Sequence, residues 1–319
     1  MLSFAHSFTH EIGWLALGVF LLGAVLEPYD RDLARPVLVA AWVLFAVFWF
    51  SLIDYYAFQQ KSVIEGVGSV AAVPLSLYVG TLLARGRDSL FVLSRAIAVM
   101  GIVYVPFVTI EELRRPLIEI VTDQTRFGTG LLGLEPDVVE GMTLADGTEI
   151  GKKSYPYEST FLWWDGDHAI TYTIRIACTG IGSMAIVAGL VGAVRAPAAR
   201  KARALAVSIP IIWLLNIVRN VFINTTFGTQ SLHVFPDPVM ALFGLSDPRF
   251  VSFILADRVI AQSLSVLALV GITWLVVREV PEVLTVLEDA IYLLTGREYD
   301  LQAALDVDRT GEEAAESTA

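Results

Sequence analysis

Long apolar stretches dominate the chain, and its polar residues gather between them. A helix needs about 20 apolar residues to cross a bilayer, and seven stretches approach or exceed that length: 12–26, 37–57, 63–84, 90–110, 169–194, 204–224 and 251–277. The first is the shortest, but it lacks the basic flank and small-residue cleavage site of a signal peptide, so we expect a retained helix. The pattern predicts an all-α polytopic membrane protein with about seven transmembrane helices.

Composition agrees with this class and adds a clue about the environment. Hydrophobic residues make up 55% of the chain and charged residues 17%, with a mean hydropathy of +0.64, which is outside the range of soluble globular proteins. The net charge is −11, and four lysines stand against eighteen arginines. This acidic, lysine-poor composition is typical of proteins that work in high salt. Cys178 is the only cysteine, so no internal disulfide can form.

Basic residues in the short loops predict the orientation of the helices. Residues 195–203 hold four basic residues and no acidic ones, the loop at 84–88 is the next best cytoplasmic candidate, and the loop at 28–36 agrees in parity. Because such loops stay in the cytoplasm, we expect the N-terminus outside and the C-terminus cytoplasmic. The long loop between the fourth and fifth helices, 111–168, and the connection at 225–250 then lie outside.

The loops and the C-terminal region carry weaker local signals. Residues 111–125 predict a short interfacial helix, an Asp-Gly turn within 141–151 predicts a small hairpin, and the aromatic run at 161–164 suits a membrane anchor. We divide the chain into a transmembrane domain, 1–278, and a cytoplasmic segment, 279–319, made of an amphipathic helix and an acidic tail. The transmembrane domain comprises the outer loop and, after it, the motif-bearing helices predicted over residues 169–277.

Three predicted helices each carry an unusual residue at a similar depth. Counted from their outer ends, Cys178, Arg219 and Arg258 lie about 8–14 Å below the outer surface. Ionisable groups within membrane helices are costly and usually functional, so their common depth predicts one shared site. Further polar or small residues follow the same predicted faces and are candidates for supporting or substrate-binding roles, although some could simply bond helices together: Thr171, Arg175, Asn216, Asn220, Asn224, Asp257, Gln262 and Ser265.

A thiol near two guanidinium groups suggests nucleophilic catalysis. Nearby cations lower the pKa of a cysteine and can also stabilise a developing oxyanion. Guanidinium stays protonated and cannot act as a general base, so the proton must move through another group, with His168, Tyr172 and water all open. Arg175 could tune the thiol, bind a lipid headgroup or extend to the interface. We expect no metal and no cofactor.

Three motifs on successive predicted spans resemble the exosortase/archaeosortase family. They are "ACTGIGS", "NIVRN" and "ADRVIAQ", and the match is specific over about residues 169–277, most similar to the archaeosortase branch of haloarchaea. The resemblance implies that Cys178 is the nucleophile and that Arg219 and Arg258 are its two basic partners. Elsewhere the chain resembles the family only in layout.

The resemblance also implies a reaction and its partners. It implies a cysteine peptidase and transpeptidase of the cell membrane, with its active site near the outer leaflet. The expected substrates are surface proteins, such as an S-layer glycoprotein, that end in a Pro-Gly-Phe motif, a transmembrane helix and a basic cluster. The helix would be removed, and the new C-terminus would pass through a Cys178 thioester to a membrane phospholipid. No nucleic-acid partner is expected.

Two other classes of membrane protein share some of these features. A microbial retinal protein would need a lysine in its last helix, and residues 251–277 contain none. A transporter could use Arg219 and Arg258 to bind an anionic solute, but it would have no need for the thiol, and the chain shows no internal repeat.

Overall fold

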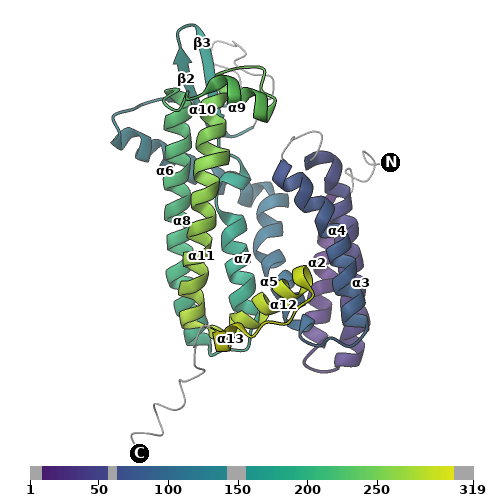
Figure 1. The fold of residues 1–319 in the computed structure, drawn as a ribbon. Helices are drawn as coiled ribbons and strands as arrows, with labels where there is room; N and C mark the ends of the chain where they lie inside the picture. Colours follow the sequence, from purple (N-terminus) through teal and green to yellow (C-terminus); the bar gives the residue numbers. More distant parts are fainter. Residues whose placement is uncertain (1–8, 57–62, 142–155, 305–319) are drawn as a thin grey trace, which may run out of the picture. The chain divides into compact units, whose positions relative to one another are not determined.

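The computed structural model describes residues 9–56, 63–141 and 156–304, and within these the chain is mostly helical (Figure 1). The α-helices are α2 (Thr9–Leu26), α3 (Arg31–Asp54), α4 (Val63–Ala84), α5 (Leu90–Thr109), α6 (Glu111–Leu131), α7 (Ile181–Ala193), α8 (Ala198–Gly228), α9 (Pro236–Phe243), α10 (Phe250–Phe253), α11 (Gln262–Glu279), α12 (Leu284–Thr295) and α13 (Leu301–Ala304). Three further helical segments are η2 (Ile176–Cys178), η3 (Ile254–Ala261) and η4 (Pro281–Val283). The strands are β1 (Asp137–Glu140), β2 (Glu158–Asp165) and β3 (His168–Thr173).

Several of these helices are long and apolar enough to cross a membrane. Six stretches meet that description: α2, α3, residues 66–84 of α4, α5, α8, and the continuous helix that α10, η3 and α11 form over Phe250–Glu279. The helix α7 is also apolar but has only 13 residues. These helices support the prediction of a multi-pass membrane protein.

The predicted span at 169–194 is wrong over its first half. Residues His168–Thr173 form β3, and the helix begins only at Ile181. The sequence could not distinguish these states, because a short apolar run rich in β-branched and aromatic residues suits either a strand or a buried helix. Cys178 therefore lies in the connection between a strand and a helix.

Contacts within the chain define two compact units. The first comprises residues 1–105, 185–206 and 275–319, and the second comprises 106–184 and 207–274. Every residue that the sequence predicts for the site belongs to the second unit.

In the first unit, α3 packs between α2 and α4 around aromatic and aliphatic side chains. Phe20 and Trp42 meet edge to face with ring centroids 5.2 Å apart, and the Trp42 indole donates to the hydroxyl of Ser94 at 2.9 Å. The N-terminus of α3 is capped by Asp30, whose carboxylate accepts two backbone N–H groups at 3.0 Å.

The amphipathic helix predicted after residue 279 is present as η4 and α12. Its Asp289 side chain, 5% exposed, accepts hydrogen bonds from Ser89 at 2.7 Å and from Arg87 at 3.3 Å. The Arg87 guanidinium also lies 3.5 Å from the centre of the Tyr292 ring. This helix is therefore held against the loop between α4 and α5 by charged and aromatic contacts.

The predicted outer loop contains much more regular structure than expected. The interfacial helix predicted at 111–125 is confirmed as a helix but is longer, because α6 runs for 21 residues. The loop also supplies a three-stranded sheet, so the chain is not purely α-helical. The residues at 161–164, expected to anchor a helix, lie in β2. The hairpin predicted at 141–151 falls almost entirely outside the described residues.

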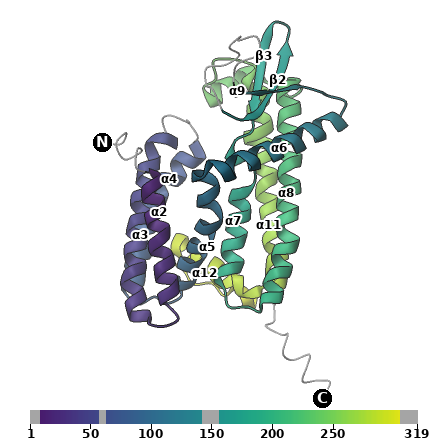
Figure 2. The same cartoon turned by 180° about the vertical axis from the view of Figure 1, so that it is seen from behind.

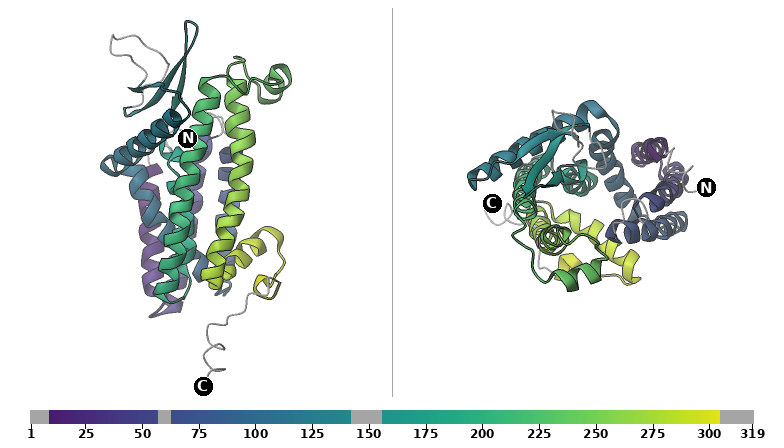
Figure 3. Two further views of the ribbon diagram at one scale, coloured as in Figure 1. Left: turned by 90° about the vertical axis from the view of Figure 1, so that its left-hand side faces the viewer. Right: turned by 90° about the horizontal axis from the view of Figure 1, so that it is seen from above.

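The sheet is an antiparallel meander in the order β1–β2–β3. Asp165 pairs with His168 to close a two-residue turn, where Gly166 adopts a φ of 60° that favours glycine. Figures 1, 2 and 3 show the β2–β3 hairpin beyond the C-terminal end of α8, which runs beside α11.

A buried core joins the sheet to the helices of the second unit. Phe161 of β2 and Ile170 of β3 pack in one cluster with Ile118 of α6 and Ile223 of α8. The Trp163 indole donates to Asn224 of α8 at 3.0 Å, and Asn224 donates in turn to Thr129 of α6 at 3.2 Å. These contacts fix β3, and hence the segment that follows it, against α8.

Candidate active site around Cys178

Cys178 ends a short helical turn between β3 and α7. The backbone is extended at Arg175 and then turns, with the N–H of Cys178 donating to the carbonyl of Arg175 at 2.7 Å. The hydroxyl of Thr179 donates back to the carbonyl of Ile176 at 2.7 Å. The thiol is therefore carried on a tight, internally bonded turn, and not on the face of a helix as predicted.

Gly180 allows this turn to approach α8 closely. It adopts a φ of +77°, and a Cβ added there would lie 3.1 Å from Cγ and 3.2 Å from Cβ of Asn216. Both the left-handed conformation and the close approach favour glycine at this position. Its role is to let the Cys178 turn approach α8.

Two amides of α8 hold the peptide carbonyl of Cys178. The side chain of Asn216 donates to this oxygen at 2.7 Å, and that of Asn220 donates at 2.8 Å. The two asparagines are four residues apart and so lie on one face of the helix. Because one carbonyl oxygen accepts both bonds, the orientation of the Cys178 peptide is fixed.

Tyr172 of β3 connects the same group to the thiol. Its buried hydroxyl donates to Oδ1 of Asn220 at 3.2 Å and also forms a hydrogen bond with the Cys178 side chain. Burial, followed by the neighbouring Cys178 thiol, raises the pKa of Tyr172 well above its ordinary value. Tyr172 is therefore a neutral hydrogen-bonding partner of the thiol.

The two predicted cations meet at one carboxylate. Arg219 Nη2 lies 2.6 Å from Oδ1 of Asp257, and Arg258 Nε lies 3.5 Å from Oδ2. The Asp257 side chain is only 12% exposed. Both Asp257 and Arg258 lie in η3, a π-helical segment, and such segments occur often at functional sites because they redirect side chains locally.

The thiol itself is not pre-ionised by these cations. Cys178, which precedes α7, packs against the buried cluster of the second unit. Burial raises the pKa of the Cys178 thiol above its ordinary value and outweighs the lowering caused by a backbone hydrogen bond at Arg175 and by Arg219, while Asp257 adds to the increase. Arg219 thus acts on this pKa in the expected direction, but in the resting protein its effect is smaller than that of burial.

Three further predicted supporting residues lie on β3, at the start of the Cys178 turn and at the start of α11. His168 is exposed at the end of the β2–β3 hairpin, about 13 Å along β3 from Tyr172 at roughly 3.3 Å per residue. The side chain of Arg175 is also exposed, although its backbone shapes the turn. Gln262 begins α11, where its backbone N–H continues the hydrogen bonding of η3.

Several kinds of polar side chain meet at this site. Among the residues that the structure describes, no group of three or more His, Cys, Asp and Glu side chains is placed to hold a metal ion. What converges is a thiol, a phenol, two amides and an Arg–Asp–Arg arrangement. The sequence identified these residue types but missed how they are connected, since the amides bond a backbone carbonyl that no side-chain motif reveals.

Fold and site together define a class, a multi-pass membrane protein whose candidate active site centres on one cysteine. Comparison with known proteins gives the family. The model of the transmembrane exosortase family matches residues 4–247, and the chain belongs to this family. The resemblance stated from the three motifs is thereby confirmed, although the matched region ends before Asp257 and Arg258.

Two curated relatives extend the similarity over almost the whole chain. Archaeosortase A of Haloferax volcanii is 49% identical over 307 residues, which cover 93% of this chain and 97% of that protein. Archaeosortase A of Natronomonas pharaonis is 42% identical over 315 residues, covering 97% and 96% respectively. No solved structure matches the chain. The protein is a membrane sorting enzyme of this family.

Proposed function

We propose that the protein is a membrane cysteine transpeptidase. It cleaves the C-terminal sorting signal of surface proteins, of the Pro-Gly-Phe type carried by an S-layer glycoprotein, and joins the new C-terminus to a membrane phospholipid. The observation that carries the proposal is the arrangement around Cys178: its peptide is held by Asn216 and Asn220, and its thiol by Tyr172. A thiol that served only packing would not need this arrangement.

In the first step the Cys178 sulfur attacks the carbonyl carbon of the scissile peptide. The C–S bond forms, the peptide C–N bond breaks, and the thiol proton passes to the nitrogen, so the signal helix leaves as a neutral amine. A thiol whose pKa is raised remains protonated until it reacts, and it can therefore supply this proton itself. Tyr172 bonds to the sulfur and is placed to assist the transfer.

In the second step a hydroxyl or amine of a lipid headgroup attacks the thioester. The bond from carbon to the headgroup oxygen or nitrogen forms, the C–S bond breaks, and the headgroup proton returns to the sulfur. The products are a lipid-linked protein and the free Cys178 thiol, so the cycle needs no oxidant, reductant or cofactor.

Arg219 and Arg258 stabilise the oxyanion that develops in both steps. Guanidinium donors aimed at developing charge in a site with little water are worth about 10²–10³ in rate. Asp257 pairs with both arginines, at 2.6 Å and 3.5 Å, and so holds them in place before substrate binds. The same pairing partly neutralises the two guanidinium charges, which disfavours tight binding of an anionic solute.

The proposed orientation places this chemistry on the outer face. Basic residues 195–203 and 84–88 favour a cytoplasmic location of their loops. The sheet and the Cys178 turn then belong to the outer side, where a surface protein would emerge from the membrane.

The test is processing of a substrate that carries a sorting signal in cells that lack the native enzyme. We expect wild-type protein to shorten the substrate and the Cys178→Ala and Cys178→Ser variants to leave it at full length. Val218→Ala is the control, since that side chain is 56% exposed on α8. Processing at the wild-type rate by either cysteine variant would refute the proposal.

A further inference from the structure

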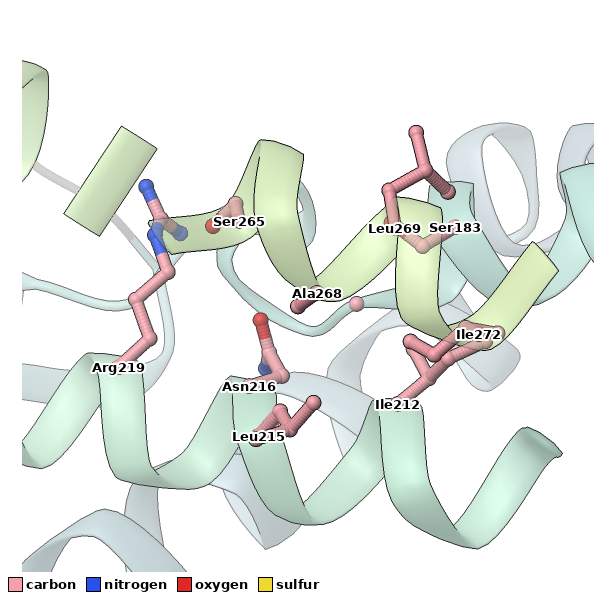
Figure 4. Close-up of a pocket in the computed structure, with 10 residues that line it drawn as sticks. Ser183, Ile212, Leu215, Asn216, Arg219, Ser265, Ala268, Leu269 and Ile272 are labelled. Carbon is pink, nitrogen blue, oxygen red and sulfur yellow. The ribbon is translucent and has the colours of Figure 1, made fainter. Parts of the chain in front are cut away.

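A cavity of about 90 Å³ lies directly beside the Cys178 turn (Figure 4). Its walls come from the start of α7, from α8 and from α11, all within the second unit. Ten residues line it: Gly180, Ser183, Ile212, Leu215, Asn216, Arg219, Ser265, Ala268, Leu269 and Ile272. Asn216 and Arg219 belong both to this lining and to the proposed active site, so the cavity is continuous with that site.

The cavity carries a charged group at one end and is mainly apolar at the other, where Ser183 also lies. Figure 4 shows Arg219 and Ser265 at one end and Ile212 and Ile272 at the other. These two pairs are separated by seven positions on each helix, which corresponds to about 10 Å at 1.5 Å per residue. A slot of this kind suits an elongated amphipathic molecule whose polar end lies near Arg219.

The same region presents apolar side chains outward. Leu215 and Leu269, which line the cavity, are 42% and 44% exposed. Their neighbours Leu214 and Val270 are 62% and 65% exposed. In helices that span a membrane, such surfaces face lipid. The cavity is therefore bordered by the lipid-facing surface of α8 and α11.

We propose that this cavity holds a hydrocarbon chain of the acceptor lipid, with the lipid headgroup near Arg219 and Cys178. The proposal rests on the proposed function, in which a headgroup attacks the Cys178 thioester. Because a bilayer solvates hydrocarbon about as well as an apolar cavity does, the cavity contributes position and not affinity. Its effect is to hold the headgroup nucleophile next to the thioester, which raises the effective concentration of that nucleophile relative to water.

The inference predicts that filling the cavity changes the product of the reaction. Ala268→Phe narrows the cavity from α11, and Ser183→Leu narrows it independently from α7. In each variant the acyl-enzyme forms normally, but the lipid is excluded. Water then hydrolyses the thioester, or the thioester accumulates. Val270→Phe adds similar bulk on α11 outside the cavity and serves as the matched control.

The experiment uses full-length protein in phospholipid vesicles with a substrate that carries a sorting signal. Mass spectrometry measures two quantities: the rate of acyl-enzyme formation at Cys178, and the fraction of product that is lipid-linked instead of a free carboxylate. We expect the lipid-linked fraction to fall by about tenfold or more in both filled variants. Acyl-enzyme formation, and the lipid-linked fraction of the control, should stay within about twofold of wild type.

Three results would overturn the inference. Slower acyl-enzyme formation in both filled variants would assign the cavity to the polypeptide substrate. An unchanged product ratio in either variant that retains the wild-type unfolding temperature would show that no lipid uses the cavity. An equal fall of the lipid-linked fraction in the Val270→Phe control would assign the effect to the outer surface of α11 and not to the cavity. Failure of the proposed function is distinct from all of these, because then the wild-type protein itself forms no acyl-enzyme.

Discussion

At Cys178 the backbone and the side chain are held by different groups, and this separation has chemical consequences. The carbonyl is fixed by Asn216 and Asn220, whereas the thiol contacts Tyr172 and experiences the field of Arg219 and Asp257. Asn216 therefore acts on position alone, whereas Asn220 links the two sets of contacts, because it also accepts from the Tyr172 hydroxyl.

The reactivity of the thiol should depend on pH in a defined direction. Because burial raises the pKa of Cys178, its alkylation rate in the resting protein should still be rising above pH 8.5, near which an ordinary thiol has its midpoint. Asp257→Asn removes a charge that raises this pKa and should shift the midpoint to lower pH, whereas Arg219→Ala should shift it to higher pH. The reporter is unambiguous, since Cys178 is the only cysteine. A midpoint that moves in the same direction in both variants would contradict this electrostatic account.

The position of the nucleophile should depend on Asn220. Asn220→Ala removes one bond to the Cys178 carbonyl and the partner of the Tyr172 hydroxyl. Asn216 still bonds the carbonyl, so each of the two lost hydrogen bonds costs about 0.5–1.5 kcal/mol, and their combined loss should slow acyl-enzyme formation by roughly 5- to 100-fold. The check is single-turnover acylation, with Val218→Ala on the outward face of the same helix as control. If Asn220→Ala slowed acylation no more than Val218→Ala does, Asn220 would not position the nucleophile.

At the level of elements, the decisive feature is the strand–turn–helix connection from β3 through η2 to α7. Its turn is stabilised by local hydrogen bonds, and the hairpin before it is fixed to α8 through Trp163 and Asn224. A Cβ at Gly228 would collide with the Trp163 ring, so α8 and β2 are in close contact there. The sheet thus determines where the nucleophile turn meets α8.

Gly180 offers a test of this connection. Gly180→Ala places a side chain in a left-handed conformation, which costs about 1–2 kcal/mol, and presses its Cβ on Asn216. Thermal unfolding in detergent should occur at a lower temperature, and acylation should slow. Gly271→Ala in α11 is the control, because a Cβ there meets nothing within 4 Å. Equal unfolding temperatures for the two variants would show that the turn bears no strain.

Sequence reasoning identified the residues of this region better than its secondary structure. Cys178, Arg219 and Asp257 were selected because polar groups in apolar stretches are expensive, and that cost does not depend on whether the segment is a helix. The strand β3 was missed because its alternation is weak, and η3 because a π-helix adds no hydrophobic signal. The pairing of both arginines with Asp257 depends on the tertiary structure and could not be read from spacing.

At the scale of the whole molecule, hydropathy and composition predicted the class of protein. The spanning helices are present, and the family comparison agrees with them. The sheet within the long loop was not predicted, since its β1 strand pairs with β2 across a segment that carries only weak turn signals. Long-range pairing of this kind is decided by burial of the sheet against α6 and α8, not by local sequence.

The orientation of the whole molecule in the membrane can be tested by cysteine labelling. In a Cys178→Ala background, Ser231→Cys should react with a membrane-impermeant maleimide in intact cells, because residues 225–250 are expected outside. Ala199→Cys should react only after lysis, because residues 195–203 are expected in the cytoplasm. Both positions are exposed in the fold, so burial prevents labelling at neither of them. The reverse pattern would invert the topology and place the site on the wrong side for surface proteins.

The proposed function requires that Cys178 becomes acylated by the surface-protein chain. The most direct measurement is mass spectrometry of the full-length enzyme incubated with an authentic sorting substrate and quenched in acid to preserve thioesters. The account predicts that the peptide containing Cys178 carries the mass of the substrate's new C-terminal fragment, and that hydroxylamine removes it. Processed substrate without any adduct on Cys178, under conditions where the wild-type enzyme turns over, would contradict it.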